Sequence, residues 1–379
     1  MNRALYVLKR LALGVPVLLF GLTMTFLILE LSPIDPVLQI LGQRAKPSDI
    51  RRLEIALNIR YPTGEIVPLW DRYLRTMWEL LTLEFGQSWS IQRPTPAMDL
   101  IFARIPATIW LGFWSVVIAL GVGVPLGLFA GLRANTWSDY FASAGGIIWR
   151  AMPNFWLAVI LSGLITAGGW LDWYRDWLIP TDVVGTPQSL GLLANGGVQI
   201  PSLPDAPDAL WALPWNVLDG TLEFLWIPFP DLYQMAAAFK WVLPAALVLG
   251  SASMGNEVRI GRTAVLESIN SKYIDTARAK GLTSWRIITK HVGRNAVLPL
   301  LPVIMGEFYL LIGGSVIVET VFSINGIGNL FLRAVTTTDI PVVMALVFVF
   351  ILIQLVFNIV QDLLYTYIDP RITLEDQTG

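Results

Sequence analysis

Residues 271–282 read Ser-Lys-Tyr-Ile-Asp-Thr-Ala-Arg-Ala-Lys-Gly-Leu, and this stretch decides how the rest of the chain is interpreted. It lies in a charged segment, 258–295, that carries eight Lys or Arg residues and two acids. Long apolar segments precede and follow that segment. A charged, helix-forming segment between apolar ones indicates an ordered loop outside a membrane, and such a loop suggests a docking surface for a soluble partner.

The stretch predicts two helices separated by a turn. Tyr273–Lys280 is rich in good helix formers, and Gly281 suits the left-handed backbone conformation that ends a helix. A second helix over 282–295 would carry an apolar face made of Trp285, Ile288 and Val292. Two helices and a turn form a rigid knob that can insert into a groove of a motor subunit. On composition alone, the plainer explanation is a basic loop that only fixes membrane topology.

The composition of the chain indicates a membrane protein. Mean hydropathy is +0.60 over 379 residues, and only 14% of the residues are charged, whereas soluble domains carry about a quarter. The net charge of −2 says little about partners, and nucleic acid is not expected among them. The absence of cysteine and the presence of one histidine exclude disulfides, thiol nucleophiles and Cys- or His-rich metal sites.

Six apolar segments are long enough to cross a bilayer, which needs about 20 residues each. We predict an all-α polytopic membrane protein whose spans lie at 11–31, 107–131 and 144–167 (together 107–167), 237–257, 297–321 and 341–367. The basic residues of the N-terminal segment 1–10 and of the loop 258–296 place both in the cytoplasm. The C-terminal tail 368–379 then lies in the cytoplasm too. A cleaved signal peptide is the alternative for the first span, but the apolar run is too long and no cleavage site follows it.

Two long loops are then extracytoplasmic. The first, 32–106, contains an amphipathic stretch over 66–81 and a second expected helix over 48–57. The second, 168–236, contains eight acids, eight prolines, six tryptophans and one basic residue. Because disordered segments contain few aromatic residues, we predict a partly ordered insertion there.

Specific motifs identify a family resemblance. The run 273–282 resembles the EAA coupling loop of the dipeptide/oligopeptide permease family of ABC importers, first-permease type. His291 stands ten residues after Gly281, as in that family. Further landmarks are Pro33-Ile34-Asp35-Pro36, Pro153-Asn154-Phe155-Trp156, Arg294-Asn295-Ala296, Glu319-Thr320-Val321-Phe322, Asp339-Ile340-Pro341 and Asp369-Pro370-Arg371. The family's Gly-Asp-x-Gly-x-Ser motif is altered to Leu83-Glu84-Phe85-Gly86-Gln87-Ser88, and 168–235 shows no resemblance.

The resemblance implies a type I ABC importer permease fold in a multi-pass plasma-membrane protein that carries peptides or related solutes. Its implied partners are a homologous second permease subunit, two ABC ATPase subunits, an extracytoplasmic binding protein and membrane lipid. No P-loop motif occurs, so ATP and Mg would bind in the ATPase subunits, and no catalytic, cofactor or metal site is expected in this chain. The implied coupling residues are Tyr273, Asp275, Ala277, Ala279, Lys280, Gly281 and His291.

Polar residues inside the predicted spans suggest function. Glu307 either faces a watery substrate path, with the amino terminus of a peptide as counter-charge, or makes an internal hydrogen bond or lies near the membrane interface. Gln354, Asn358 and Asp362 share one helix face, where hydrogen bonding between helices is preferred to a role in the substrate pathway. Glu319 is expected near the membrane interface.

Glycines in the second span predict close helix packing. Gly123, Gly127 and Gly131 form two overlapping Gly-x-x-x-Gly steps, which let helices approach closely. We expect this packing within the chain, with a seam between two subunits as the lesser alternative.

Other classes of function stay open on the sequence. A stand-alone secondary transporter or channel would need ion-coupling residues at the membrane midplane, and Glu307 is the candidate. A membrane-bound enzyme is disfavoured because no catalytic constellation is recognisable. Nothing in the sequence distinguishes a dipeptide, an oligopeptide, a nickel chelate or a sugar as the solute.

Overall fold

The computed structural model describes residues 3–42, 44–165, 169–171, 173–174, 232–296, 298–300, 302–304, 306–307 and 316–368. The regular elements of these residues are helices. The chain divides into a first unit, Met1–Ile105 with Ile327–Gly379, and a second unit, Pro106–Gly326. Most of the predicted insertion, 168–236, lies outside the described residues.

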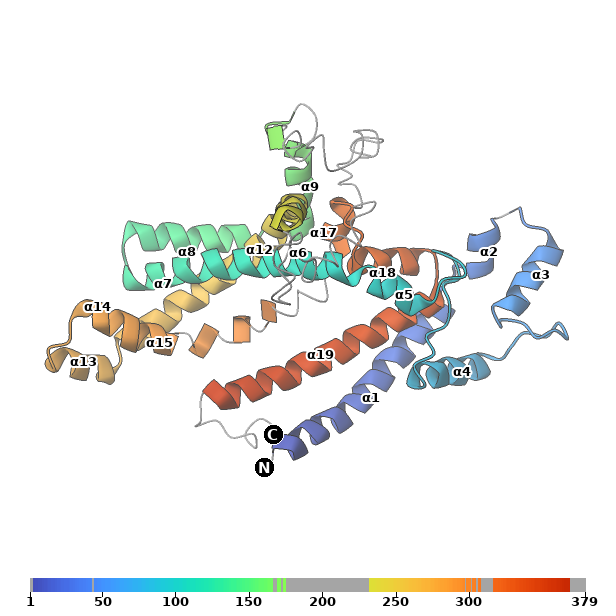
Figure 1. The fold of residues 1–379 in the computed structure, drawn as a ribbon, viewed down its shortest axis with the longest axis horizontal. Coiled ribbons are helices and arrows are strands. Elements are labelled where there is room, and N and C mark those ends of the chain that lie inside the picture. The colour runs from blue at the N-terminus through green and yellow to red at the C-terminus, as the bar shows by residue number, and fades with distance from the viewer. Residues whose placement is uncertain are drawn as a thin grey trace, which may run out of the picture. The chain divides into compact units, whose positions relative to one another are not determined.

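Two long apolar helices form the frame of the first unit. Helices α1 (Arg3–Glu30) and α19 (Ile340–Ile368) lie side by side (Figure 1). Each contains a stretch that is long and apolar enough to cross a membrane, with mean hydropathy of 2.3 and 2.9 respectively. They overlap the predicted spans 11–31 and 341–367. Gly21 leaves room for the partner helix, because a Cβ there would stand 2.6 Å from Ile351 Cδ1.

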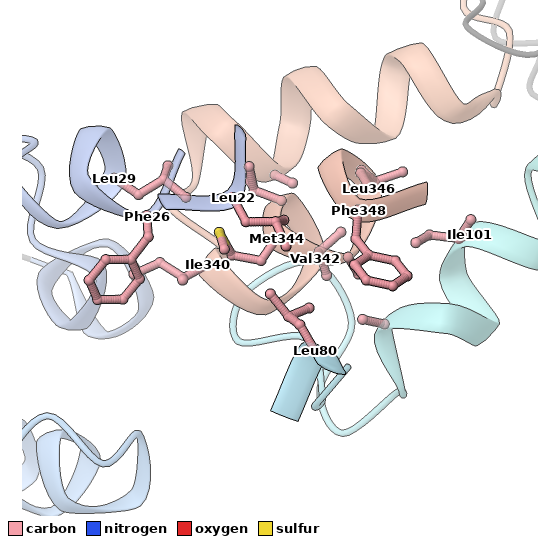
Figure 2. Close-up of a cluster of buried hydrophobic side chains, with 14 of the residues drawn as sticks. Leu22, Phe26, Leu29, Leu80, Ile101, Ile340, Val342, Met344, Leu346 and Phe348 are labelled. Carbon is pink, nitrogen blue, oxygen red and sulfur yellow. The ribbon is translucent and has the colours of Figure 1, made fainter. Parts of the chain in front are cut away.

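Short helices complete the core of the first unit. They are α2 (Pro36–Leu41), α3 (Pro47–Ala56), α4 (Leu69–Leu81), α5 (Ala97–Phe102) and α18 (Ile327–Thr336). Helices α3 and α4 lie where the sequence predicts helices over 48–57 and 66–81. Figure 2 shows side chains from α1, α4, α5 and α19 that point toward one another, among them Leu22, Phe26, Leu80, Ile101 and Met344. This apolar contact fixes α4 and α5 onto the long helices α1 and α19.

The second predicted span is one continuous helical run with a π turn inside it. Helix α6 (Ile105–Ile118) passes through η1 (Ala119–Gly123) into α7 (Val124–Leu132). Pro125 explains the turn, because it has no N–H for the carbonyl four residues before it and its ring crowds that carbonyl. The hydrogen bonds therefore shift to the wider π spacing over one turn.

The third predicted span is bent, which the sequence prediction of one span over 144–167 misses. Helix α8 (Trp137–Arg150) ends three residues before α9 (Asn154–Ile165) begins, and the two helices meet at 95°. Pro153 lies at the break, and a proline disfavours helical backbone in the residue before it. Hydropathy does not reveal the bend, since both helices are apolar.

Helix α12 (Leu232–Ile269) carries the chain from the membrane to the loop 258–296. Its 38 residues span about 57 Å at 1.5 Å per residue, well beyond the ~30 Å hydrocarbon core of a bilayer. It therefore continues past the predicted span 237–257 into the charged segment. Five short helices follow, namely α13 (Lys272–Ala279), α14 (Ser284–Arg286), η4 (Ile287–Val292), α15 (Gly293–Ala296) and η5 (Leu298–Leu300). Of the predicted fifth span, 297–321, the described part includes α17 (Val316–Val321).

Glycines bring α7 and α12 into backbone contact. A Cβ at Gly127 would stand 2.8 Å from the carbonyl oxygens of Glu257 and Val258. A Cβ at Gly131 would stand 2.6 Å from Val265 Cβ. Side chains essentially never approach so closely, so only glycine fits. The predicted packing of the Gly-x-x-x-Gly steps within the chain is confirmed.

We expect Gly127→Ala to destabilise the second unit by about 1–3 kcal/mol, because the added methyl group meets two backbone carbonyls that cannot yield. The matched control is Gly121→Ala in the same span, where a Cβ has nothing within 4 Å. The thermal midpoint of the purified protein, followed by tryptophan fluorescence, should fall for Gly127→Ala only. Equal midpoints for both variants would contradict the close contact.

Candidate functional site

The loop after α12 folds as the sequence predicts, into a helix, a glycine turn and a second helical segment. Helix α13 ends at Ala279, and Gly281 adopts a φ of +72°. The N–H of Gly281 donates to the carbonyl of Arg278 at 2.9 Å, which closes the end of the helix. Left-handed backbone at this position favours glycine over every other residue. We call residues 271–296 the knob.

The knob packs against the end of α12 through a small apolar core. Its buried members are Ile274, Ala277, Ile287, Val292 and Ala296, which pack against Ala264 and Val265. Trp285, expected on the apolar face, is 75% exposed, and Ile287 lies in the core instead. The π turn η4 accounts for the error, because an α-helical spacing predicts the wrong face where the backbone is wider.

The predicted coupling residues divide into an exposed set and a packed set. Ala277 is buried in the core of the knob, and His291 in η4 is half-buried. The exposed residues of the set are Tyr273, Asp275, Ala279, Lys280 and Gly281. Asp275 and Arg278 are 3.5 Å apart and both solvent-exposed, so this pair adds little stability. The exposed set is available to a partner, whereas Ala277 keeps the knob folded.

A buried ion pair that the sequence does not reveal holds α12 to the first turn of α8. Arg262 Nη2 donates to Asp139 Oδ2 at 2.7 Å, and Arg262 Nε donates to Oδ1. Asp139 is 1% exposed and also accepts from the Asn135 N–H at 2.9 Å. The Arg262 guanidinium holds the pKa of Asp139 at about 2, below the usual 3.8, helped by the Asn135 and Ser143 hydrogen bonds against the effect of burial.

We expect Asp139→Asn to lower the thermal midpoint at pH 7, since it leaves Arg262 without its counter-charge. A lowered pKa in the folded state stabilises the protein at pH values above about 4, and this contribution is lost as the pH falls through about 2. The difference between wild type and variant should therefore be largest near neutral pH and shrink below pH 4. The control is Asp275→Asn, which removes an exposed carboxylate. A difference that is constant from pH 7 to pH 3 would contradict this assignment.

The polar residues of the last predicted span do not act as one group. Asp362 accepts from Tyr6 Oη at 2.6 Å and pairs with Arg10 Nη2 at 2.9 Å, both on α1. Gln354 donates to Asn358 at 3.0 Å along α19 itself. For Asp362 the structure therefore shows bonding between helices. A role of these residues in a substrate pathway stays a prediction.

Glu319 is buried against a neighbouring helix, and its expected position near the membrane interface stays a prediction. Its side chain has 0% exposure and accepts a hydrogen bond from Thr108 at 3.0 Å. The sequence does not reveal this contact, because hydropathy places a residue along a span but does not show which helix it faces. Gly326 packs against Glu319 so closely that a Cβ there would stand 2.6 Å from Oε2.

Glu307, the candidate pathway residue, is 8% exposed and adjoins Glu257 of α12. The sequence does not indicate a special role for Glu257, because this residue is the last one of the predicted fourth span, 237–257. A carboxylate at the end of a span is ordinarily solvated, and nothing in the order of residues indicates that α12 continues past it. The two glutamates thus form a pair that only the fold reveals.

The first unit contains a polar cavity of about 340 Å³. Its lining comes from the end of α1, residues 56–94 and the start of α19, and includes the charged residues Glu30, Arg72, Arg75, Glu79, Glu84 and Arg93. Burial raises the pKa of Glu79, with Arg75 opposing this effect. A cavity with both signs of charge suits a polar or zwitterionic group better than an apolar one.

Asp339, immediately before α19, holds the segment around Ser88 in place in the first unit. It has 0% exposure and accepts from the Ser88 hydroxyl at 2.6 Å and from the backbone N–H groups of Trp89 and Ser90 at 2.9 and 3.0 Å. The structure thereby joins two separate motifs of the sequence, Leu83–Ser88 and Asp339–Pro341. A carboxylate with this many donors is held firmly in place, so the altered motif around Ser88 is structural.

The chain is similar to known proteins along most of its length. Residues 123–374 match the family described as "Binding-protein-dependent transport system inner membrane component". A dipeptide transport system permease protein DppB of Alkalihalophilus pseudofirmus is 30% identical over 97% of this chain and 98% of its own length. The oligopeptide transport system permease protein AppB of Bacillus subtilis is 28% identical over 97% and 99%. An inward-facing MetNI methionine ABC transporter structure matches 74% of this chain and 100% of its own, at 20% identity and a TM-score of 0.45.

Proposed function

This chain belongs to the family of binding-protein-dependent transport system inner membrane components, and on that basis we propose that it translocates di- or oligopeptides, or related solutes, delivered by an extracytoplasmic binding protein. It is a multi-pass protein of the plasma membrane and a permease of an ABC importer. Family membership favours this function over a stand-alone secondary transporter or channel. The peptide as substrate is supported by the names of the relatives, which match nearly the full chain.

The complete assembly would contain a homologous second permease subunit, two ABC ATPase subunits and the binding protein. ATP and Mg would bind in the ATPase subunits. Both termini of this chain would lie in the cytoplasm, on the same side as the knob, because the basic residues concentrate there. The extracytoplasmic loop with its polar cavity would then face the binding protein.

One observation carries the mechanism, namely that the knob is a packed element attached to the end of a single long helix. Its buried core rests on Ala264 and Val265 of α12, and α12 continues from there through the membrane. A force on the exposed face of the knob is therefore transmitted to the span without bending a flexible loop. ATP-driven closure of the motor subunits would bias the spans between inward- and outward-facing states in this way.

We expect Gly281→Val to lower ATP-driven uptake of a labelled dipeptide by about fivefold or more. A β-branched residue at a φ of +72° costs at least about 1 kcal/mol, which corresponds to about a factor of five in an equilibrium. The valine side chain meets no steric clash with other residues, because nothing lies within 4 Å of a Cβ at residue 281. Uptake is measured in proteoliposomes that contain the complete complex and the binding protein.

The matched control is Gly42→Val, which places the same residue at a φ of +79° with open space around it, but in the extracytoplasmic loop. This variant should retain uptake. Wild-type uptake by Gly281→Val in a fully assembled complex would exclude the knob as the coupling element. No ATP-dependent uptake by the wild-type complex with di- or oligopeptides would overturn the proposed substrate and leave the family assignment intact.

A further inference from the structure

Helix α4 presents a row of large apolar side chains on its outer side. Four residues, each between 48% and 69% exposed, make up this row, namely Trp70, Leu74, Trp78 and Leu81. Their spacing of four, four and three residues places them on one face of the helix. We call this row the outer stripe. Proteins rarely leave a contiguous apolar surface open to water, so the stripe indicates an occupant outside the chain.

The other faces of α4 have partners within the first unit. Met77 and Leu80 are buried in its apolar core, and Tyr73 packs against that core. On the polar side, Arg75 and Glu79 line the cavity of the first unit. The outer stripe therefore lies on the side of the helix away from the cavity, next to the face that packs on the core.

The contacts of α4 show how far along the membrane span of α1 it lies. Helix α4 stands beside the C-terminal part of α1 (Figure 1). Tyr73 Oη is 2.9 Å from Thr23 Oγ1, and the Tyr73 ring meets Phe26 edge-on with 5.5 Å between centroids. Arg72 Nη1 pairs with Glu30 Oε2 at 2.6 Å. Glu30 is the last residue of the candidate span, and Thr23 lies seven residues, or about 10 Å of helix, before it.

Helix α4 therefore lies alongside the last two turns of a membrane span. In those turns α1 has its own exposed apolar row, Phe20, Met24 and Ile28, which faces lipid if α1 crosses the bilayer. Trp70 stacks on Tyr73 at 5.3 Å between ring centroids, and Tyr73 is the side chain that contacts α1. The outer stripe is thus continuous with the part of the first unit that lies in the bilayer.

The residue types of α4 fit the boundary between lipid headgroups and acyl chains. Tryptophan is enriched at that boundary because its ring is apolar and its N–H remains near water. An amphipathic helix at the boundary lies in the membrane plane with its apolar face sunk about 5–10 Å. Two acids and two arginines balance each other on α4, so apolar insertion would hold the helix there without attraction to anionic lipid.

We propose that the outer stripe of α4 is inserted into the lipid bilayer, in the leaflet that α1 reaches at Glu30, with Trp70 and Trp78 as its anchors. A soluble partner fits less well, because it cannot reach side chains that lie alongside a membrane span. Insertion fixes the wall of the polar cavity at the membrane surface and leaves the cavity on the side away from the acyl chains. This inference holds whatever solute the transporter carries.

The test places a fluorophore on the outer stripe and asks what surrounds it. The chain has no cysteine of its own, so Leu74→Cys and Trp78→Cys each provide one thiol for an NBD label. The complete complex, with the reactive cysteines of its other subunits replaced, is reconstituted into phosphatidylcholine liposomes. We expect both labels to lose fluorescence when the acyl chains carry bromine and to resist quenching by iodide in the water.

The matched control is Glu79→Cys, the neighbour of Trp78 on the cavity side. Its label should be quenched by iodide and spared by brominated lipid. Three results at residues 74 and 78 would each overturn the proposal. Iodide quenching as strong as at residue 79 would place the stripe in water. Protection from both quenchers would indicate cover by another subunit, and iodide quenching that disappears when the binding protein is added would indicate that protein.

A second measurement uses the wild-type chain and so does not depend on the folding of a variant. The complex is reconstituted with a phosphatidylcholine that carries a photoreactive diazirine on its acyl chain, and adducts are mapped by mass spectrometry. We expect adducts on the outer stripe as well as on Ile28 of α1. Adducts on Ile28 with none on the four stripe residues would contradict the insertion. Neither measurement uses transport, so a failure here is distinct from a failure to find peptide uptake.

Discussion

The backbone contact between α7 and α12 is the constraint on which the second unit depends. Gly127 meets the carbonyl oxygens of two α12 residues, and Gly261 of α12 lies 3.3 Å, measured from its Cβ position, from Gly127 Cα. Apolar burial does not hold helices together inside a lipid phase, where the tails are as apolar as leucine. Close packing over small residues does, and it determines the separation of the two helices at their contact.

The stiffness of the knob follows from this packing. Helix α12 is held along its length by α7 and α8, and Arg262 ties its C-terminal part to the buried Asp139. The knob then rests on the side chains of α12 immediately beyond that ion pair, at Ala264 and Val265. A loop with only surface contacts would deform under an applied force, whereas a packed core transmits the force to α12. The basic residues that fix topology are thus compatible with a mechanical role of the same segment.

Sequence reasoning predicted features set by local chemistry. The lengths of α1 and α19 follow from apolar runs, and the left-handed Gly281 follows from its place after a helix-forming stretch. Features set by contacts between distant segments were missed. Trp285 is exposed because a π turn shifts the helix face, Glu319 is buried against Thr108, and the bend at Pro153 is invisible to hydropathy. Glu257 was missed because its neighbour Glu307 lies in another helix.

The buried acidic residues of the two units differ in the contacts that they make. Asp139, Glu319 and Asp339 each accept hydrogen bonds from named partners, and each joins segments that are distant in the sequence. Their burial is explained by the contacts that they make. Glu257 is also buried, and its carboxyl group adjoins that of Glu307 from another segment. Burying two carboxyl groups side by side is costly, since packing alone would favour an apolar residue at either position, so this pair differs from the acids that accept hydrogen bonds from neutral or cationic donors.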